Sequence, residues 1–156
     1  MATTAPRSDS AAPDRAARRH PALIIAGTVI AALGVNLVIW LIGTAIGGKF
    51  EYVSDGKTAS STPWFVAAET AVPLALGLTL AALIAIKWRR IIPIAQVIGV
   101  LLALGTAVGP FITDFDSTTS TVSLALMHLV VATAVVLGLA AVAKPSNSVT
   151  TPNHRN

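Results

Sequence analysis

The sequence predicts an all-α integral membrane protein, in which four transmembrane helices form an up-down-up-down bundle. The composition points this way, because 54% of the 156 residues are apolar and only 12% are charged. Crossing a bilayer takes about 20 apolar residues in a helix, and four apolar runs are long enough: Ala22–Ile46, Trp64–Ile86, Ile91–Phe111 and Val122–Ala143. Backbone groups in hydrocarbon must be bonded within their own segment, so these runs are expected to be helices. A soluble four-helix bundle is the competing interpretation, but the runs contain no Lys or Arg.

The segments around the runs can be interpreted in chain order. Residues 1–20 are rich in Ala, Pro, Ser and Arg and are predicted to be disordered, and so is the polar segment 145–156. The first apolar run exceeds the roughly 7–15 residues of a signal-peptide core, so it is expected to stay as a helix. Residues 47–63 form the longest connection and could contain a brief strand or turn near Phe50. The short connection 87–90 makes the second and third helices antiparallel neighbours within the transmembrane domain, residues 21–144.

Positive charge predicts the orientation of the chain. Of the 11 Lys and Arg residues, eight lie in the tails or in the connection 87–90, Lys144 directly precedes the C-terminal tail, and only Lys49 and Lys57 lie on the other side of the predicted bundle. Because Lys and Arg concentrate in cytoplasmic loops, both termini are expected in the cytoplasm of a multi-pass cell membrane protein. The same bias explains the net charge of +4 without nucleic acid as a partner.

The sequence lacks the residues that several classes of chemistry require. The chain has no cysteine, which excludes disulfides, thiolate metal sites and cysteine nucleophiles. It also has no complete Gly-x4-Gly-Lys-Ser/Thr phosphate loop and no Gly-x-Ser-x-Gly motif. A metal site built on Glu69, His128 and Asp114 would need further ligands. We therefore expect no enzyme activity, no cofactor and no metal. The expected partners are the lipid bilayer and either another membrane protein or a second copy of the chain.

Glu69 and His128 are the ionisable side chains inside the four runs. Such groups are costly in a membrane and usually face the bundle interior, pair, or mark a pathway. With a rise of 1.5 Å per residue, Glu69, His128 and Asn36 lie roughly 8–15 Å below the outer interface. We expect them to form a cluster that opens outward, with Asp114 and Asp116 above it, and Glu69, His128, Asn36 and Asp114 are the candidate ligand- or proton-binding residues. A buried Glu69–His128 hydrogen bond that only fixes helix register is the alternative interpretation.

Small residues predict which helix faces meet protein. Gly43 and Gly47 end the first run, and Gly105 and Gly109 occupy the same end of the third. Such Gly-xxx-Gly pairs allow close helix packing, within the bundle or in a homodimer. The repeated spacing is also compatible with a duplicated two-helix hairpin. Two further faces are expected to meet protein. They consist of Gln96, Gly99, Ala103, Thr106 and Pro110 on the third helix, and of Glu69, Pro73 and Gly77 on the second.

The third and fourth helices also resemble a known family. The residues are Leu104-Gly105-Thr106 to Pro110, then Asp114 to Thr119, then Leu124 to Val130 with the Met127-His128 pair. They resemble an actinobacterial family of small four-helix membrane proteins known only as a domain of unknown function. The resemblance extends from about Ala22 to Ala143. It implies the four-helix architecture and brings no activity with it.

Three functions remain open from the sequence. The first is a small interaction or accessory protein of the cell envelope, which the small size, the packing glycines and the absence of catalytic motifs favour. The second is a small proton- or cation-coupled transporter that works as an oligomer and uses Glu69 as its membrane carboxylate. The third is a lipid- or quinone-binding protein, in which His128 forms a hydrogen bond with the head group.

Overall fold

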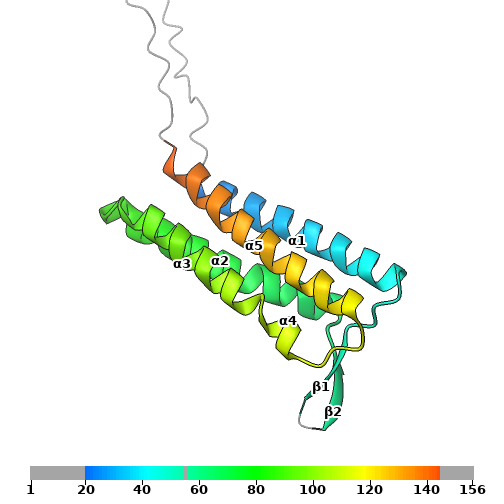
Figure 1. Cartoon of the computed structure of the whole chain (residues 1–156). Helices are drawn as coiled ribbons and strands as arrows, with labels where there is room; N and C mark the ends of the chain where they lie inside the picture. Colours follow the sequence, from blue (N-terminus) through cyan, green and yellow to red (C-terminus); the bar gives the residue numbers. More distant parts are fainter. Residues whose placement is uncertain (1–19, 55, 145–156) are drawn as a thin grey trace, which may run out of the picture.

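A computed structural model describes residues 20–54 and 56–144 of the protein. The elements are α1 (Pro21–Ala45), β1 (Glu51–Ser54), β2 (Lys57–Ser60), α2 (Pro63–Lys87), α3 (Ile91–Thr106), α4 (Gly109–Ile112) and α5 (Thr118–Ala143) (Figure 1). Four helical segments, α1, α2, α3 with α4, and α5, are long and apolar enough to cross a membrane. The predicted all-α bundle is confirmed, and the chain is a multi-pass membrane protein. The two tails predicted to be disordered lie outside the described residues, except for His20.

Capping residues and prolines explain where the helices begin and end. The Thr62 hydroxyl accepts from the Phe65 N–H at 3.3 Å, and Pro63 occupies the first helical position of α2. Ser117 caps α5 by accepting from the Ser120 N–H at 3.2 Å. This helix starts at Thr118, whereas the sequence predicted a start at Val122. The two differ because the first turn of the helix is polar and so lies outside the apolar run. The predicted third helix is divided into α3 and α4, since Pro110 has no N–H to continue the α-helical bonds.

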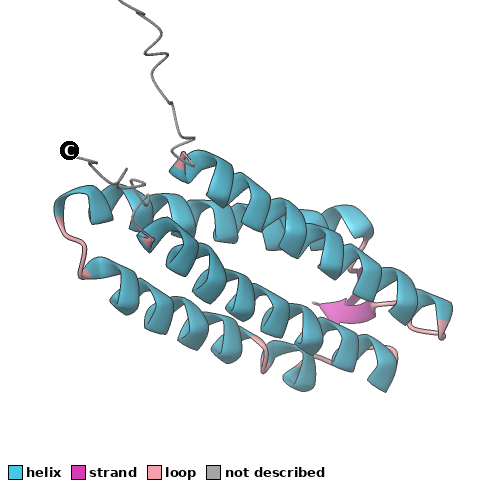
Figure 2. Ribbon diagram, turned by 90° about the horizontal axis from the view of Figure 1, so that it is seen from above, coloured by secondary structure: helices cyan, strands magenta, loops and turns pink. Residues whose placement is uncertain are grey.

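The four membrane segments run side by side, with two distinct ends (Figures 1 and 2). We call the end that carries the β-hairpin the hairpin end. The opposite end holds the start of α1, the end of α5 and the α2–α3 turn, and we call it the tail end. α5 packs extensively on both α1 and α3, and α1 also packs on α2. α2 and α3 are antiparallel as predicted, yet they contact each other much less than either contacts its other main neighbour.

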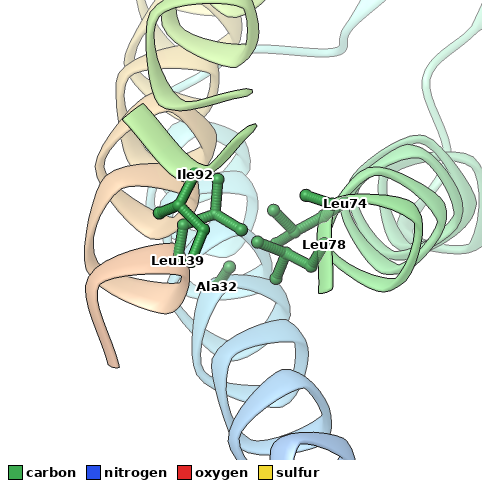
Figure 3. Close-up of a cluster of buried hydrophobic side chains, with 6 residues drawn as sticks. Ala32, Leu74, Leu78, Ile92 and Leu139 are labelled. Carbon is green, nitrogen blue, oxygen red and sulfur yellow. The ribbon is translucent and has the colours of Figure 1, made fainter. Parts of the chain in front are cut away.

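The apolar core lies where α1, α2, α3 and α5 approach one another. Leu74 and Leu78 project from α2 toward Ala32 and Leu139, and Ile92 of α3 completes the group (Figure 3). A second cluster near the hairpin end contains Phe50, Val66 and Met127. Only 11–22% of the apolar window of each span is buried inside the bundle. The large apolar side chains on the remaining surface suit contact with lipid tails better than contact with water.

Glycines permit close contact where α5 meets its two main neighbours. A Cβ added at Gly43 of α1 would lie 2.8 Å from the Ser123 hydroxyl of α5, and one added at Gly138 of α5 would lie 2.9 Å from a methyl carbon of Thr28. On α3, a Cβ at Gly99 would lie 2.7 Å from a methyl carbon of Val135. Small residues thus let these helices approach closely, as is usual in membrane bundles.

The β-hairpin is fastened to the start of α5 by one carboxylate. The Asp116 side chain accepts from the Lys49 N–H and the Glu51 N–H, both at 3.1 Å, and from the Ser120 hydroxyl at 2.8 Å. The Asp116 N–H in turn donates to the Glu51 carbonyl at 2.9 Å. We call this set of bonds the Asp116 clasp. The predicted strand near Phe50 is confirmed, with β1 and β2 pairing antiparallel.

Phe50 is fully buried and lies next to the Asp116 clasp. Its side chain is 0% exposed and stacks on Trp40 with ring centroids 6.0 Å apart. Its backbone φ of 55° lies in the left-handed region, which is unfavourable for a residue with a Cβ. Hydrogen bonds on both sides hold this conformation, because its N–H donates to the Ser120 hydroxyl and its carbonyl accepts from the Ser61 N–H. The hairpin end is therefore a defined structure rather than a loose loop.

Candidate functional site

A large groove separates α2 from α3. Its volume is about 800 Å³, and residues of α5 also line it, as does Asn36 of α1. We call it the α2–α3 groove. It exists because the two helices are held apart, each being packed against a different neighbour. Small residues widen it: Pro73 and Gly77 line the α2 side, and a Cβ added at Gly77 would have no neighbour within 4 Å.

Polarity changes along the groove. Toward the tail end the lining side chains are apolar, with Leu78 and Ile84 on α2 and Ile91 and Ile98 on α3. Toward the hairpin end it contains polar side chains from several elements, namely Asn36, Tyr52, Ser61, Glu69, Thr70, Thr106, Thr113 and His128. The groove thus has one apolar half and one half that can form hydrogen bonds.

Asn36 provides a polar atom without a partner on the groove lining. Its side chain is 1% exposed, and its Nδ2 donates to the Thr70 hydroxyl of α2 at 2.9 Å. Its Oδ1 is buried and has no hydrogen-bond partner within residues 20–54 and 56–144. Leaving a buried amide oxygen unsatisfied costs about 1–3 kcal/mol. Among the described residues, this is the buried side-chain polar atom left without a hydrogen-bond partner.

His128 lines the same groove from α5, and its tautomer follows from its hydrogen bond. Nδ1 lies 2.8 Å from the Leu124 carbonyl oxygen, which can only accept, so Nδ1 carries the proton. In the neutral ring Nε2 is then an acceptor. The ring is half-buried and none of the described residues bonds to Nε2.

Glu69 lies on the α2 side of the groove and is exposed. Within the described residues no hydrogen bond or ion pair joins it to His128, so the alternative of a register-fixing bond has no support. The two side chains instead line one groove together with Asn36. Pro73 adds a further acceptor, because it has no N–H to donate to the Glu69 carbonyl. The face Glu69–Pro73–Gly77, expected to meet protein, lines this open groove.

Asp114, the fourth candidate, is exposed and does not line the groove. Its neighbour Asp116 forms the clasp instead. Partial burial alone would raise the pKa of Asp116. The hydrogen bonds from the Lys49 N–H, from the Ser120 and Ser117 hydroxyls and from the Glu51 N–H outweigh that effect and hold the pKa below its usual 3.8. The ionised Asp116 is thus part of the folded hairpin end.

The two Gly-xxx-Gly pairs differ in their surroundings. Gly43 is buried against Phe50 and Ser123, and Gly47 follows α1 with a φ of 102° that favours glycine. A Cβ at Gly105 or Gly109 would meet nothing within 4 Å. The two pairs therefore have no common packing role in the described structure.

The predicted protein-facing side of α3 is confirmed at most of its residues. The Gln96 side chain donates to the Val136 carbonyl of α5 at 2.9 Å, and Ala103 and Pro110 are buried. Gly99 lies against Val135. Thr106 lies on the groove, where its hydroxyl bonds to carbonyls of its own helix.

Sequence reasoning missed Thr70 and the groove itself. Thr70 is ordinary in a membrane helix, and only its buried bond to Asn36 distinguishes it. The groove is lined mostly by Leu, Ile and Ala, which look the same in sequence whether they face lipid, protein or a cavity. The stack of Pro73 and Gly77 one and two turns after Glu69 was the available signal, since small residues leave space beside a helix.

Comparison with known proteins adds the family. No curated protein and no solved structure matches the chain. The model of a family of unknown function matches residues 14–145, which include all four membrane segments and the whole groove. This confirms the resemblance to a domain of unknown function, while an actinobacterial source and a special role of the Met127-His128 pair stay predictions. The chain therefore belongs to the family of unknown function DUF6069.

Proposed function

We propose that this protein is a non-enzymatic accessory protein of the cell membrane that binds one amphiphilic lipid-like molecule in the α2–α3 groove. The observation that supports this most is the polarity of the groove, polar in its hairpin half and apolar in its tail half. A single-chain amphiphile has the same division. Its head group would lie near Asn36 and His128, and its chain would extend toward Ile84 and Ile91.

The size of the groove favours a small ligand over a partner helix. A volume of about 800 Å³ falls within the roughly 300–1,000 Å³ of typical small-molecule sites. A membrane-spanning helix about 10 Å wide and about 30 Å long fills more than about 2,000 Å³. The groove also opens between two lipid-facing helices, so a membrane molecule could enter it sideways.

The transporter alternative has less support. A polar solute or ion needs polar groups along its whole path. The groove has ionisable side chains only in its hairpin half, at Tyr52, Glu69 and His128, whereas its tail half is lined by apolar side chains. The distribution of Lys and Arg favours a cytoplasmic tail end, so the polar half of the groove would lie in the outer leaflet.

Native mass spectrometry of the protein purified in mild detergent tests the proposal. We expect most protein molecules to carry one additional mass that corresponds to a single bound lipid. Gly77→Leu should remove it, because the new side chain projects into the groove where no neighbour lies within 4 Å. Gly34→Leu is the matched control: Gly34 is also a helical glycine with nothing within 4 Å, but it lies on α1 outside the groove.

The outcomes separate the functions. A bound lipid lost in Gly77→Leu and kept in Gly34→Leu supports the proposal. A wild-type chain without any bound lipid, or one that keeps its lipid in Gly77→Leu, contradicts it. A stoichiometric second protein in place of the lipid would support the interaction function predicted from the sequence.

A further inference from the structure

Building on the proposed function, we infer that the groove selects a head group that donates hydrogen bonds and carries no negative charge. A hydroxyl or an amine has these properties, whereas a phosphate or a carboxylate does not. The inference rests on which polar atoms remain without a protein partner, and on which charged side chains line the groove.

One observation is the Oδ1 of Asn36, which has no hydrogen-bond partner among the described residues. It is buried and unpartnered on a side chain that is 1% exposed and lines the groove. Its Nδ2 is already bonded to Thr70. With the amide in this orientation, the carbonyl oxygen can only accept, so its partner would be a donor. A head group with an O–H or N–H supplies it.

The other free atoms on the polar half point to the same chemistry. With Nδ1 engaged by the Leu124 carbonyl, His128 offers Nε2 as an acceptor. The Glu69 carboxylate accepts when ionised and keeps an acceptor oxygen even when protonated. Asn36, Glu69 and His128 come from α1, α2 and α5, so acceptors line the groove from three helices.

The charge balance of the groove argues against an anionic head. No Lys or Arg is among the residues that line it. Glu69, Asn36 and His128 lie roughly 9–15 Å from the hairpin end of their helices, so a head group that reaches them leaves water. An anion there would face the Glu69 carboxylate and no lining cation, which is unfavourable.

Photolabelling in phosphatidylcholine nanodiscs tests the inference. The probes are hexadecanol, hexadecylamine and hexadecyl phosphate, each with the same mid-chain diazirine, and labelled residues are located by mass spectrometry. We expect the alcohol and the amine to label groove residues of α2 and α3 about tenfold more than the phosphate, because an unpaired anion is the costliest head group there. Labelling by the alcohol and the amine should fall in Gly77→Leu and persist in Gly34→Leu.

Two variants identify the acceptors and distinguish the two head groups. His128→Phe keeps an aromatic ring but removes Nε2, and it should lower labelling by the alcohol about three- to tenfold. Glu69→Gln removes the negative charge. A fall in labelling by the amine alone means that the carboxylate pairs with a cationic head group, and unchanged labelling by both probes means that the negative charge of Glu69 is not needed for recognition.

Failure of the inference and failure of the proposed function give different results. Equal labelling of the groove by all three probes, or stronger labelling by the phosphate, would overturn the selection while leaving an amphiphile site. Absence of groove labelling by every probe would overturn both.

Discussion

Two helix pairs in this bundle contrast, although both run antiparallel. α1 and α5 are far apart in the sequence and lie in close contact, with Gly43 against Ser123 and Gly138 against Thr28. α2 and α3 are joined by a short turn and enclose a groove of about 800 Å³. A short connection thus makes two helices antiparallel, but it holds them close together only at the connected end. Whether two helices pack along their length depends on the side chains between them and on their other neighbours.

The glycines make this difference testable. At Gly43 a side chain would collide with Phe50 and Ser123, whereas at Gly77 it would enter open space. The first glycine is needed for packing, and the second keeps the groove wide. A substitution at Gly43 should therefore lower stability, whereas a substitution at Gly77 should lower lipid binding with little effect on stability.

The largest effect is expected for Gly43→Leu. The nearest ring atom of Phe50 lies 2.7 Å from the ideal Cβ position, and that ring is fully buried. Overpacking of this kind costs about 1–3 kcal/mol and sometimes more. Unfolding in a mixed-micelle SDS titration measures it, with Gly34→Leu as the control. Equal stability of the two variants would mean that α1 and α5 are not closely packed here.

Asp116→Asn should have the next largest effect, by loosening the hairpin from α5. Loss of charge-assisted bonds is expected to cost about 1–2 kcal/mol, reduced by the exposure of the site. The folded-state pKa lies below 3.8, so the stabilisation is present above that pH and is lost as the pH falls through the folded pKa. The wild type should therefore lose stability on acidification below about pH 3.8 more steeply than the variant does. Parallel pH curves for the two proteins would contradict the clasp.

A smaller effect is expected for Gln96→Leu, which removes the bond from α3 to the Val136 carbonyl. Interhelical hydrogen bonds in membrane proteins are worth about 0.6 kcal/mol on average, and the carbonyl keeps its own helical partner. The same SDS titration should show a loss near this value. A loss above about 2 kcal/mol would show that this single bond holds α3 in place.

The smallest effect on stability is expected for Gly77→Leu. A side chain that meets no neighbour should change the free energy of unfolding by no more than about 0.5 kcal/mol. Its loss of bound lipid should nevertheless be complete. Strong destabilisation would mean that α2 and α3 close on each other in the membrane.

The sequence was sufficient for the spans but not for their arrangement. Apolar runs locate helices because spanning a bilayer requires length and hydrophobicity, and the predicted bounds differ from the structure mainly where polar caps or prolines intervene, as at Ser117 and Pro110. The small face of α3 was also predictable, since Gln96 and Gly99 repeat at helical spacing. The sequence could not predict which two helices enclose a groove, because a Leu beside a groove is indistinguishable in sequence from a Leu beside lipid.

The candidate site shows the same limit. Glu69, His128 and Asn36 were identified because polar groups are rare in membrane spans, and all three line one groove. Their partners were not predictable: Asn36 bonds to Thr70, and His128 bonds to its own helix. Asp114 and Asp116 are equivalent in sequence, and only the position of the hairpin selects Asp116 for the clasp.

The clasp also has a consequence for the order of assembly. Its bonds join residues 65 and 67 positions apart, and the Phe50–Ser120 bond spans 70. During synthesis the N-terminal part of a chain is made first, so the hairpin emerges well before its partner. Until residue 120 has been translated, Phe50 has no hydroxyl to hold its left-handed backbone. The Asp116 clasp can form only after the start of α5 has been made, so its formation marks a chain whose first three membrane segments have already been synthesised.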